Sequence, residues 1–435
     1  MNNPDDNTNR PLQFATERML GAHRLAQYVS RNRCERYLRL ALFPSEGNEL
    51  KTRYGVTFET LSPLLSSEGQ SFERDKVEEL RAQGELIVDL TNKSAADFLD
   101  ELTWQKQEGR TYYYQPALEG RIGGWLCGGR ADLIEATRSN EGAFSFVVID
   151  IKTSARETVG FRLQVAFYAL LLKSLLSDNQ LTLEEMRGAI ASREIEFTAG
   201  AWRMFDLALF TDEINRLIAA PDSDVARAAA STFSTAVYHL GSHCDGCPYN
   251  ALCFVDTAER EDLSLVPHLT STEKRALHAE GISTVSELSR LVTYTERGVE
   301  TAPGCEREVN RVSGHWALGA RLPTLAQRAR AALARFTEKG DDKAVEYRRA
   351  LYASNWGSLP DTNQYPDLVK VFIDAQRDHI QDRLYMLAAS VTGPRGIVNV
   401  IEMANARARS RRRAKIACRV AAKTIACRQA RGRFK

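Results

Sequence analysis

The chain has 435 residues, more than one hydrophobic core usually holds, so its length predicts two or three domains. Apolar residues make up 43% of the chain and charged residues 26%, and no stretch of about 18 apolar residues occurs, which excludes disordered, collagen-like and membrane-spanning proteins. The N-terminus lacks a basic region followed by an apolar one, which predicts a cytoplasmic protein with no membrane partner.

The net charge of +2 conceals an uneven distribution of charged residues along the chain. Residues 395–435 hold thirteen Lys or Arg and one acid, whereas residues 1–394 hold 45 bases and 55 acids. Clusters of Lys and Arg displace counterions from phosphate backbones, but a merely solvated tail has the same composition. Composition therefore leaves contact between this tail and nucleic acid open.

Hydrophobic periodicity in the first part of the chain predicts an α/β order of elements. The expected strands are rich in β-branched and aromatic residues and are separated by Gly pairs or a polar turn. We expect helices over residues 14–42, 69–80 and 161–176, and strands over residues 86–90, 111–117, 121–127, 130–135 and 144–152.

The strongest chemical signal lies in two of these strands. Because side chains alternate along a strand, Asp150 and Lys152 share one face with Val148, and burying their charges is costly unless a metal or a partner compensates. Asp132 precedes Asp150 by eighteen residues, a distance at which a β-hairpin could bring the two carboxylates together as a Mg²⁺ site. The metal could then activate water, while Lys152 orients it or offsets charge on a scissile phosphate. The plainer alternative is an ion pair at a strand end.

A tight loop holds three thiols, those of Cys244, Cys247 and Cys253. Gly246 and Pro248 supply turn backbone that lets neighbouring side chains point at one centre. Thiolates select zinc, copper(I) or an iron-sulfur cluster, and a zinc site or a four-iron cluster needs a fourth ligand. Three buried thiols without a metal are the alternative. The candidates for the fourth ligand are His243, Cys34, Cys127 and Cys305.

Beyond the cysteine loop the periodicity predicts a small helical region followed by strands. We expect a helical hairpin over residues 265–291 around Gly281, a helix over residues 326–336, and strands over residues 368–374 and 384–391. The composition changes abruptly after Pro394.

Together the segments Gly129-Arg-Ala-Asp132, Val148-Ile-Asp150-Ile-Lys152 and Gln164-x-x-x-Tyr168 resemble the motifs of the RecB-like nucleases of the PD-(D/E)xK superfamily. The resemblance implies an α/β, restriction-endonuclease-like core with a mixed sheet flanked by helices, followed by a small helical domain. The implied divisions are a nuclease domain over residues 1–260, a helix-hairpin-helix-like region over residues 261–345, a possible RNase H-like start over residues 346–394, and a basic, disordered or helical tail over residues 395–435.

The resemblance also implies roles for individual residues. Asp132, Asp150 and Glu73 would bind Mg²⁺ or Mn²⁺, and Lys152 would assist the attacking water. Gln164 and Tyr168 would position DNA or the active-site lysine. Glu73 is assigned because the family carries an acid or His four residues after a Gly on an early helix. Gly69-x-x-x-Glu73 fits this pattern, and so does Gly55-x-x-x-Glu59; the longer helical run after Glu73 favours it.

Members of this family with a 4Fe-4S cluster, which include AddB subunits and CRISPR adaptation nucleases, carry one cysteine before the nuclease core and three after it. Carried over, this arrangement selects Cys34 as the fourth ligand beside Cys244, Cys247 and Cys253, and sets Cys127 and Cys305 aside. The cluster would be structural, closing the core by joining segments more than two hundred residues apart.

Two C-terminal segments resemble further modules incompletely. The hairpin at residues 265–291 is similar to a helix-hairpin-helix, which binds DNA phosphates through backbone amides, but Leu269-Thr-Ser-Thr stands where the hairpin glycine is usual, which favours a packing role. Residues 371–387 look like the opening strands of an RNase H-like domain, with Asp374-Ala-Gln376 where an Asp-x-Glu pair is expected. The basic segment from Arg395 resembles neither fold.

The sequence thus predicts a metal-dependent DNA nuclease with an iron-sulfur cluster. We expect it to act on single-stranded or end-containing DNA in repair, recombination or defence, alone or beside a helicase. Two alternatives stand beside it: a non-catalytic scaffold that binds nucleic acid, and a nuclease that acts on RNA. Motifs that recognise phosphate and metal do not separate RNA from DNA.

Overall fold

The computed structural model describes residues 19–58, 63–104, 109–154, 157–193, 198–295, 298–333, 365–378, 383–394 and 396–403. The chain divides into two compact units. The first contains residues 1–293 and 300–347, and the second contains residues 294–299 and 348–435. Each unit is described separately, and the expected domain boundaries within the first remain a prediction.

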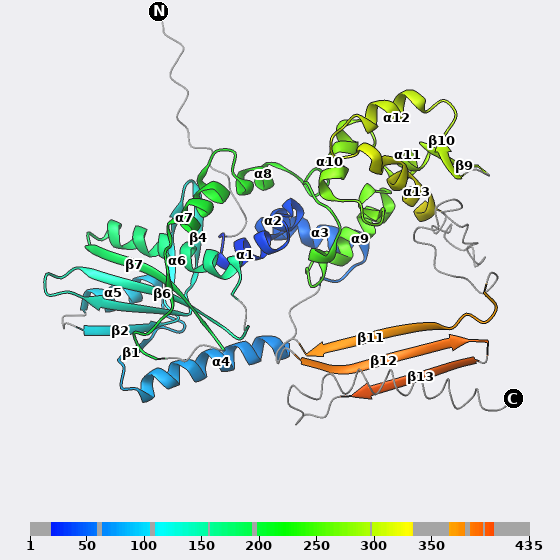
Figure 1. Cartoon of the computed structure of the whole chain (residues 1–435). Helices are drawn as coiled ribbons and strands as arrows, with labels where there is room; N and C mark the ends of the chain where they lie inside the picture. Colours follow the sequence, from blue (N-terminus) through cyan, green and yellow to red (C-terminus); the bar gives the residue numbers. More distant parts are fainter. Residues whose placement is uncertain are drawn as a thin grey trace, which may run out of the picture. The chain divides into compact units, whose positions relative to one another are not determined.

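A six-stranded mixed sheet forms the centre of the first unit (Figure 1). β1 runs parallel to β2 and β6 parallel to β7, while the other neighbours are antiparallel. Across the sheet the order is β1 (Ile87–Asp89), β2 (Gly109–Tyr114), β5 (Leu133–Arg138), β6 (Phe144–Lys152), β7 (Leu183–Ser192) and β8 (Met204–Phe205). The mixed sheet flanked by helices is therefore confirmed.

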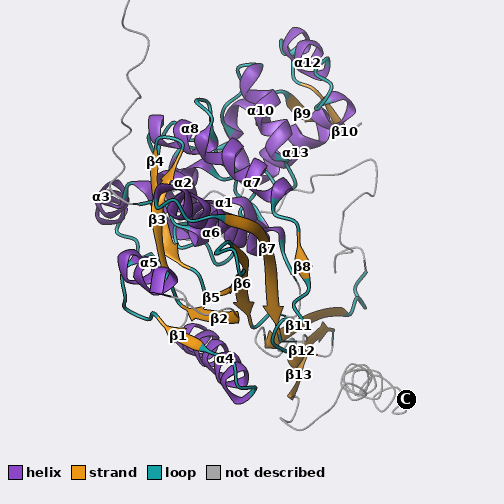
Figure 2. Ribbon diagram, turned by 90° about the vertical axis from the view of Figure 1, so that its left-hand side faces the viewer, coloured by secondary structure: helices purple, strands orange, loops and turns teal. Residues whose placement is uncertain are grey.

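Helices cover both faces of β6 (Figure 2). Phe144, Phe146 and Val148 pack with α6 (Val159–Asp178) on one face, whereas Val147, Ile149 and Ile151 pack with α4 (Pro63–Ala82) on the other. This is the strict alternation expected of a strand covered on both sides. Asp150 and Lys152 consequently lie on the face of β6 that α6 covers.

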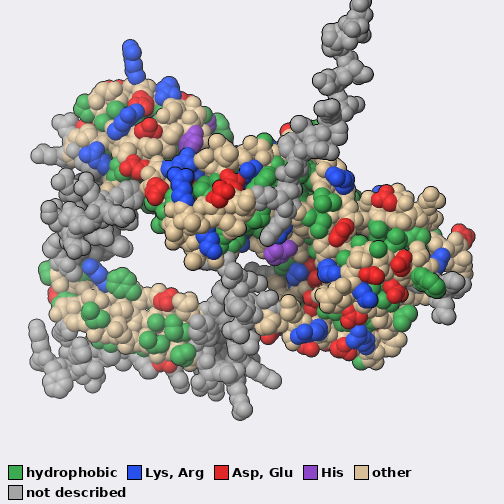
Figure 3. Space-filling view, turned by 180° about the vertical axis from the view of Figure 1, so that it is seen from behind, with side chains coloured by type: hydrophobic (Ala, Val, Ile, Leu, Met, Phe, Trp, Pro, Cys, Tyr) green, Lys and Arg blue, Asp and Glu red, His purple; other side chains and the backbone are tan. Residues whose placement is uncertain are grey.

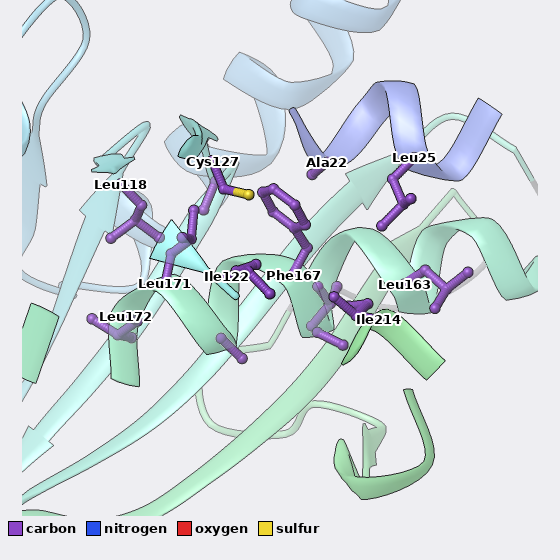
Figure 4. Close-up of a cluster of buried hydrophobic side chains, with 14 of the residues drawn as sticks. Ala22, Leu25, Leu118, Ile122, Cys127, Leu163, Phe167, Leu171, Leu172 and Ile214 are labelled. Carbon is purple, nitrogen blue, oxygen red and sulfur yellow. The ribbon is translucent and has the colours of Figure 1, made fainter. Parts of the chain in front are cut away.

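The core between α6 and the hairpin of β3 (Ala117–Ile122) and β4 (Trp125–Arg130) is apolar (Figure 4). Leu118, Ile122, Cys127 and Phe167 all belong to it. The expectation of one strand over residues 121–127 is wrong, because Gly123 and Gly124 form the hairpin turn there, with a φ of 59° at Gly123. β-branched and aromatic residues on both sides of the Gly pair concealed the reversal.

By length and composition, α6 is apolar enough to cross a membrane, although its apolar residues are interrupted. Of the window that meets this test, 56% is buried inside the fold. Its buried side chains pack on the sheet and on the β3–β4 hairpin. These contacts are those of a central core helix.

Further helices pack on α6, on the sheet or on one another. They are α1 (Ala22–Ser30), α2 (Glu35–Leu42), α3 (Pro44–Tyr54), α5 (Ala95–Trp104), α7 (Ala208–Ile214), α8 (Asp224–Ala230) and α9 (Asn250–Glu259). The helix expected over residues 14–42 is interrupted, because Asn32 and Arg33 adopt left-handed backbone conformations with φ of 55° and 54°. Cys34 then starts α2 as its N-cap residue.

The helical region follows in the first unit, except for residues 294–299 of its ribbon, which belong to the second, and the hairpin around Gly281 is confirmed. Its elements are α10 (Ser271–Ala279), α11 (Val285–Ser289), a two-stranded ribbon of β9 (Val292–Thr295) and β10 (Gly298–Thr301), α12 (Glu306–Ser313) and α13 (Leu322–Leu333). α13 packs against α11.

The second unit contains a three-stranded antiparallel sheet. β11 (Lys370–Asp378) pairs with β12 (Arg383–Gly393), which pairs with β13 (Gly396–Met403). The two expected strands are present, and β13 adds a third within the segment where only a basic tail was expected. The RNase H-like origin of this sheet remains a prediction.

Candidate active site

The site lies where β6 ends beside the start of β5. Leu133 pairs with Ile149, which sets Asp132 next to the end of β6. The Ile151 backbone N–H donates to Asp132 Oδ2 at 2.8 Å and so fixes this carboxylate on the sheet. Two antiparallel strands thus bring Asp132 and Asp150 together, as their spacing in the sequence predicts.

Lys152 lies between the two carboxylates. Its Nζ is 2.6 Å from Asp150 Oδ1 and 3.4 Å from Asp132 Oδ2. Burial lowers the pKa of Lys152, but the charges of Asp150 and Asp132 outweigh burial and raise its pKa above the usual value. The lysine is therefore a cation at neutral pH, which suits it to donate hydrogen bonds and offset negative charge but not to accept a proton.

Asp150 is the most strongly perturbed acid of the site. It is 3% exposed, and its Oδ2 is buried without a hydrogen-bond partner in the structure. Burial and the nearby charge of Asp132 raise its pKa well above that of an ordinary Asp, although Lys152 opposes the shift. An ionised carboxylate with an unpartnered buried oxygen is costly unless a cation or a hydrogen-bond donor is added.

Glu73 approaches the pair from α4. Burial and the charge of Asp132 raise its pKa, while hydrogen bonds from Gln115 and Tyr114 oppose this shift. Gln115 Nε2 donates to Glu73 Oε1 at 2.9 Å. The structure therefore places Glu73 near Asp132 and Lys152, whereas the alternative, Glu59, lies outside the described residues.

α6 supplies Tyr168 and, one turn earlier, Gln164. Burial raises the pKa of Tyr168, and the charges of Asp132 and Asp150 raise it further, so the phenol keeps its proton. A Cβ atom on Gly129 in β4 would lie 3.0 Å from the Tyr168 hydroxyl, so any larger residue there would require the Tyr168 side chain to shift. Gln164 is buried on the same helix, and its part in the site remains a prediction.

Gln115 is a site residue that sequence reasoning missed. Its backbone N–H donates to the Asp132 carbonyl at 3.0 Å, and its own carbonyl accepts from Arg130 Nη1 at 2.9 Å. Its φ of 51° is unusual for a residue with a side chain. Strained backbone is often retained at functional sites. The local sequence Tyr-Gln-Pro carried no signal of this role beyond a turn before Pro116.

These side chains have the chemistry of a divalent-cation site. Carboxylate oxygens are the ligands that Mg²⁺ and Mn²⁺ prefer, and the partnerless Asp150 Oδ2 lacks the charge partner that a cation supplies. As the side chains stand, with Lys152 between the aspartates, no three His, Cys, Asp or Glu among the described residues form a ready metal cage. These carboxylate oxygens fit a divalent cation, which would compete with the Lys152 ammonium for them.

The second candidate centre joins Cys34 to the cysteine loop. Arg31 Nη2 donates to the Gly246 carbonyl at 3.0 Å, and the Glu35 backbone N–H donates to the Val237 carbonyl at 3.1 Å. Burial raises the pKa of Cys34 to about 11, and the neighbouring thiols Cys247 and Cys244 contribute to the increase. Burial also raises the pKa of Cys253 to about 12, and the charge of Cys34 contributes to this increase. Cys34 thus lies near the other three thiols, but among the described residues no three of these thiols are grouped closely enough to form a metal site.

The other candidates for a fourth ligand lie elsewhere or are already bonded. Cys127 is 0% exposed inside the apolar core beneath α6 (Figure 4). Cys305 donates to the Arg290 carbonyl in the helical region. His243 lies in the cysteine loop, where its Nε2 pairs with the His239 carbonyl at 2.9 Å. The placement of the thiols favours Cys34, and the ligand set remains a prediction.

Comparison with known proteins identifies one family. The profile of the PD-(D/E)XK nuclease superfamily matches residues 35–254, which is about half of the chain and includes both strands of the site. No curated protein and no solved structure matches the chain.

Replacing Gln115 by Gly should weaken cation binding without weakening the fold. Gly adopts a positive φ freely but cannot orient Glu73, and loss of such an outer partner typically weakens metal affinity about 10- to 100-fold. The measurement is calorimetric titration of the metal-free protein with Mn²⁺, accompanied by thermal unfolding.

Gln180→Gly is the matched control, because Gln180 has a φ of 55° at the end of α6. It should leave the affinity for Mn²⁺ unchanged. Equal affinities in the two variants would show that Gln115 does not position Glu73.

Proposed function

The chain belongs to the PD-(D/E)XK nuclease superfamily, and from this premise we propose that it is a metal-dependent nuclease that hydrolyses phosphodiester bonds in DNA. The observation that carries the proposal is that the Lys152 ammonium bridges the buried Asp150 and the partly buried Asp132. Glu73 on α4 lies near Asp132 and Lys152, and a structural ion pair at a strand end does not require this third acid.

Asp132, Asp150 and Glu73 would hold a Mg²⁺ or Mn²⁺ ion. When bound, the ion would polarise the phosphate and help to deprotonate the attacking water. Lys152, held as a cation, donates hydrogen bonds to that water or to the phosphate, where negative charge develops. Tyr168, held as a neutral phenol, donates to a phosphate oxygen or to a carboxylate.

We also propose the finer features that the sequence predicts. The substrate would be single-stranded or end-containing DNA, cut in repair, recombination or defence with or without a helicase, and the relationship would be to the RecB-like nucleases. Cys34, Cys244, Cys247 and Cys253 would bind a 4Fe-4S cluster that ties α2 to the loop before α9. The nearness of Cys34 to the other three thiols supports this choice of ligands.

The helical hairpin is proposed to pack rather than to offer its amides to DNA. Glu273 accepts hydrogen bonds from the Thr270 N–H at 2.7 Å and from the Thr270 hydroxyl at 2.9 Å, and Arg321 pairs with it at 2.9 Å. The start of α10, where a phosphate would bind in a helix-hairpin-helix, is thus filled by the protein's own carboxylate. Thr284 and Glu287 form the same capping box at the start of α11.

Two substitutions should separate cation binding from catalysis. Asp150→Asn should abolish cleavage of end-labelled DNA and weaken Mn²⁺ binding, because it removes a ligand. Lys152→Ala should reduce cleavage about 100-fold or more while retaining or strengthening Mn²⁺ binding, because it removes the ammonium that competes for the carboxylates. Cleavage assays and Mn²⁺ calorimetry measure the two effects.

Asp100→Ala on α5 and Lys173→Ala on the exposed side of α6 are the controls and should cleave like the unsubstituted protein. If the unsubstituted protein binds DNA but cuts neither DNA nor RNA with Mg²⁺ or Mn²⁺, the nuclease proposal fails and a binding scaffold replaces it. Cleavage of RNA but not of DNA would change the proposed substrate from DNA to RNA.

Cysteine substitutions test the second centre. Anaerobically purified protein should contain about four iron atoms and four sulfides per chain, and Cys34→Ser should lose them as fully as Cys247→Ser, because each removes one thiolate. Cys305→Ser should retain them. Stoichiometric zinc without iron would replace the cluster with a zinc site, and a fully loaded Cys34→Ser protein would contradict the ligand set.

A further inference from the structure

A polar groove lies within the first unit, away from the carboxylates. Its volume is about 620 Å³. It is bounded by the end of α1, the start of α2, α8, the segment before the cysteine loop, the end of α9 and α10. The groove is thus formed where the helical region meets the nuclease fold, and Figure 3 shows Lys and Arg side chains gathered beside a His in this area.

Cations form the outer surface of the groove. Arg33, Arg227 and Arg260 have side chains 52%, 52% and 47% exposed, and Arg275 is also exposed. His239 and His278 line the same groove. Within the lining the bases outnumber the acids by five to three.

The acids of the groove lie beneath the arginines and are engaged there. Asp224 accepts a hydrogen bond from the Tyr28 hydroxyl at 2.7 Å and pairs with Arg227. Asp262 accepts from Lys274 at 2.7 Å. Glu35, the Asp222 carbonyl and Asp224 occupy all three guanidinium nitrogens of Arg227, and Arg33 pairs with Glu213. The exposed Arg260 and Arg275 are therefore the arginines of the groove that are best placed to receive an anion. Such a surface is prepared for an anion.

The groove is too large for one phosphate, and its cations are spread around the rim rather than gathered at one point. These features fit a polyanion with regularly spaced charges. α1 connects the groove to the active site: Tyr28 of α1 lines the groove, and α1 packs against α6, the helix that carries Tyr168. A helix of nine residues spans about 13 Å, a distance that a few nucleotides cover.

We propose that this groove binds the phosphate backbone of a single nucleic-acid strand on its way to or from the carboxylate site. The proposal rests on the proposed nuclease function for its ligand class. The arginines and histidines bind phosphate oxygens through their side chains, so recognition is independent of base sequence. This differs from the capped helix starts of the hairpin, where the backbone amides are already occupied.

The test is binding of a fluorescent single-stranded DNA of about 20 nucleotides, longer than most single-strand sites, to the full chain in EDTA. Arg260→Glu combined with Arg275→Glu should raise the Kd about tenfold or more and reduce the dependence of binding on salt. Arg187→Glu on β7, also an exposed arginine, should leave the Kd unchanged. Thermal unfolding checks that all variants fold.

Hydrolysis of bis(p-nitrophenyl) phosphate separates this proposal from the proposed function, because so small a diester reaches the carboxylates without the groove. The double variant should hydrolyse it like the unsubstituted protein. An unchanged Kd for the DNA strand, no strand binding by the unsubstituted protein, or equally strong competition by poly-glutamate would each overturn the groove proposal, whether or not the small diester is cleaved.

Discussion

The burial of Asp150 is the constraint on which the rest of the first unit depends. β6 is covered by α6 on one face and by α4 on the other, so the Asp150 carboxylate near its end is shielded from water. A buried charge persists only with compensating partners, and Lys152 on the same face supplies one. The two helices that cover β6 also carry Tyr168, on α6, and Glu73, on α4. The packing of helices on β6 therefore accounts both for the burial of Asp150 and for the positions of Tyr168 and Glu73.

The segments before and after the sheet are joined by a second buried charge. Arg36 is 0% exposed, donates to Asp256 at 2.7 Å, and lies 4.0 Å and 3.4 Å from the ring centroids of Phe233 and Tyr238. Removing one partner of a buried pair typically costs about 3–5 kcal/mol. This pair fixes α2 against α9 independently of any metal, so the fold itself brings Cys34 to the cysteine loop.

The sequence predicted the elements whose side-chain period is unambiguous. β6 and the helix of Gln164 and Tyr168 followed from alternation and helical spacing, and the approach of Asp132 to Asp150 followed from hairpin geometry. Interruptions of helices and strands were harder to predict from the sequence. The left-handed residues Asn32 and Arg33 and the turn at Gly123 interrupt segments whose composition is uniform. Gln115 carried no signal, because its role depends on a tertiary contact with Glu73 across 42 positions.

The charges of the site explain why its acids are perturbed. When Asp132, Asp150 and Glu73 are ionised and Lys152 is protonated, the four groups carry a net charge of about −2 in a largely buried space. Burial and mutual repulsion therefore raise the pKa values of Asp150 and Glu73. A divalent cation would cancel this charge and give Asp150 Oδ2 a partner, whereas a monovalent ion would leave half of it uncompensated. The charge of the site itself thus favours a divalent ion.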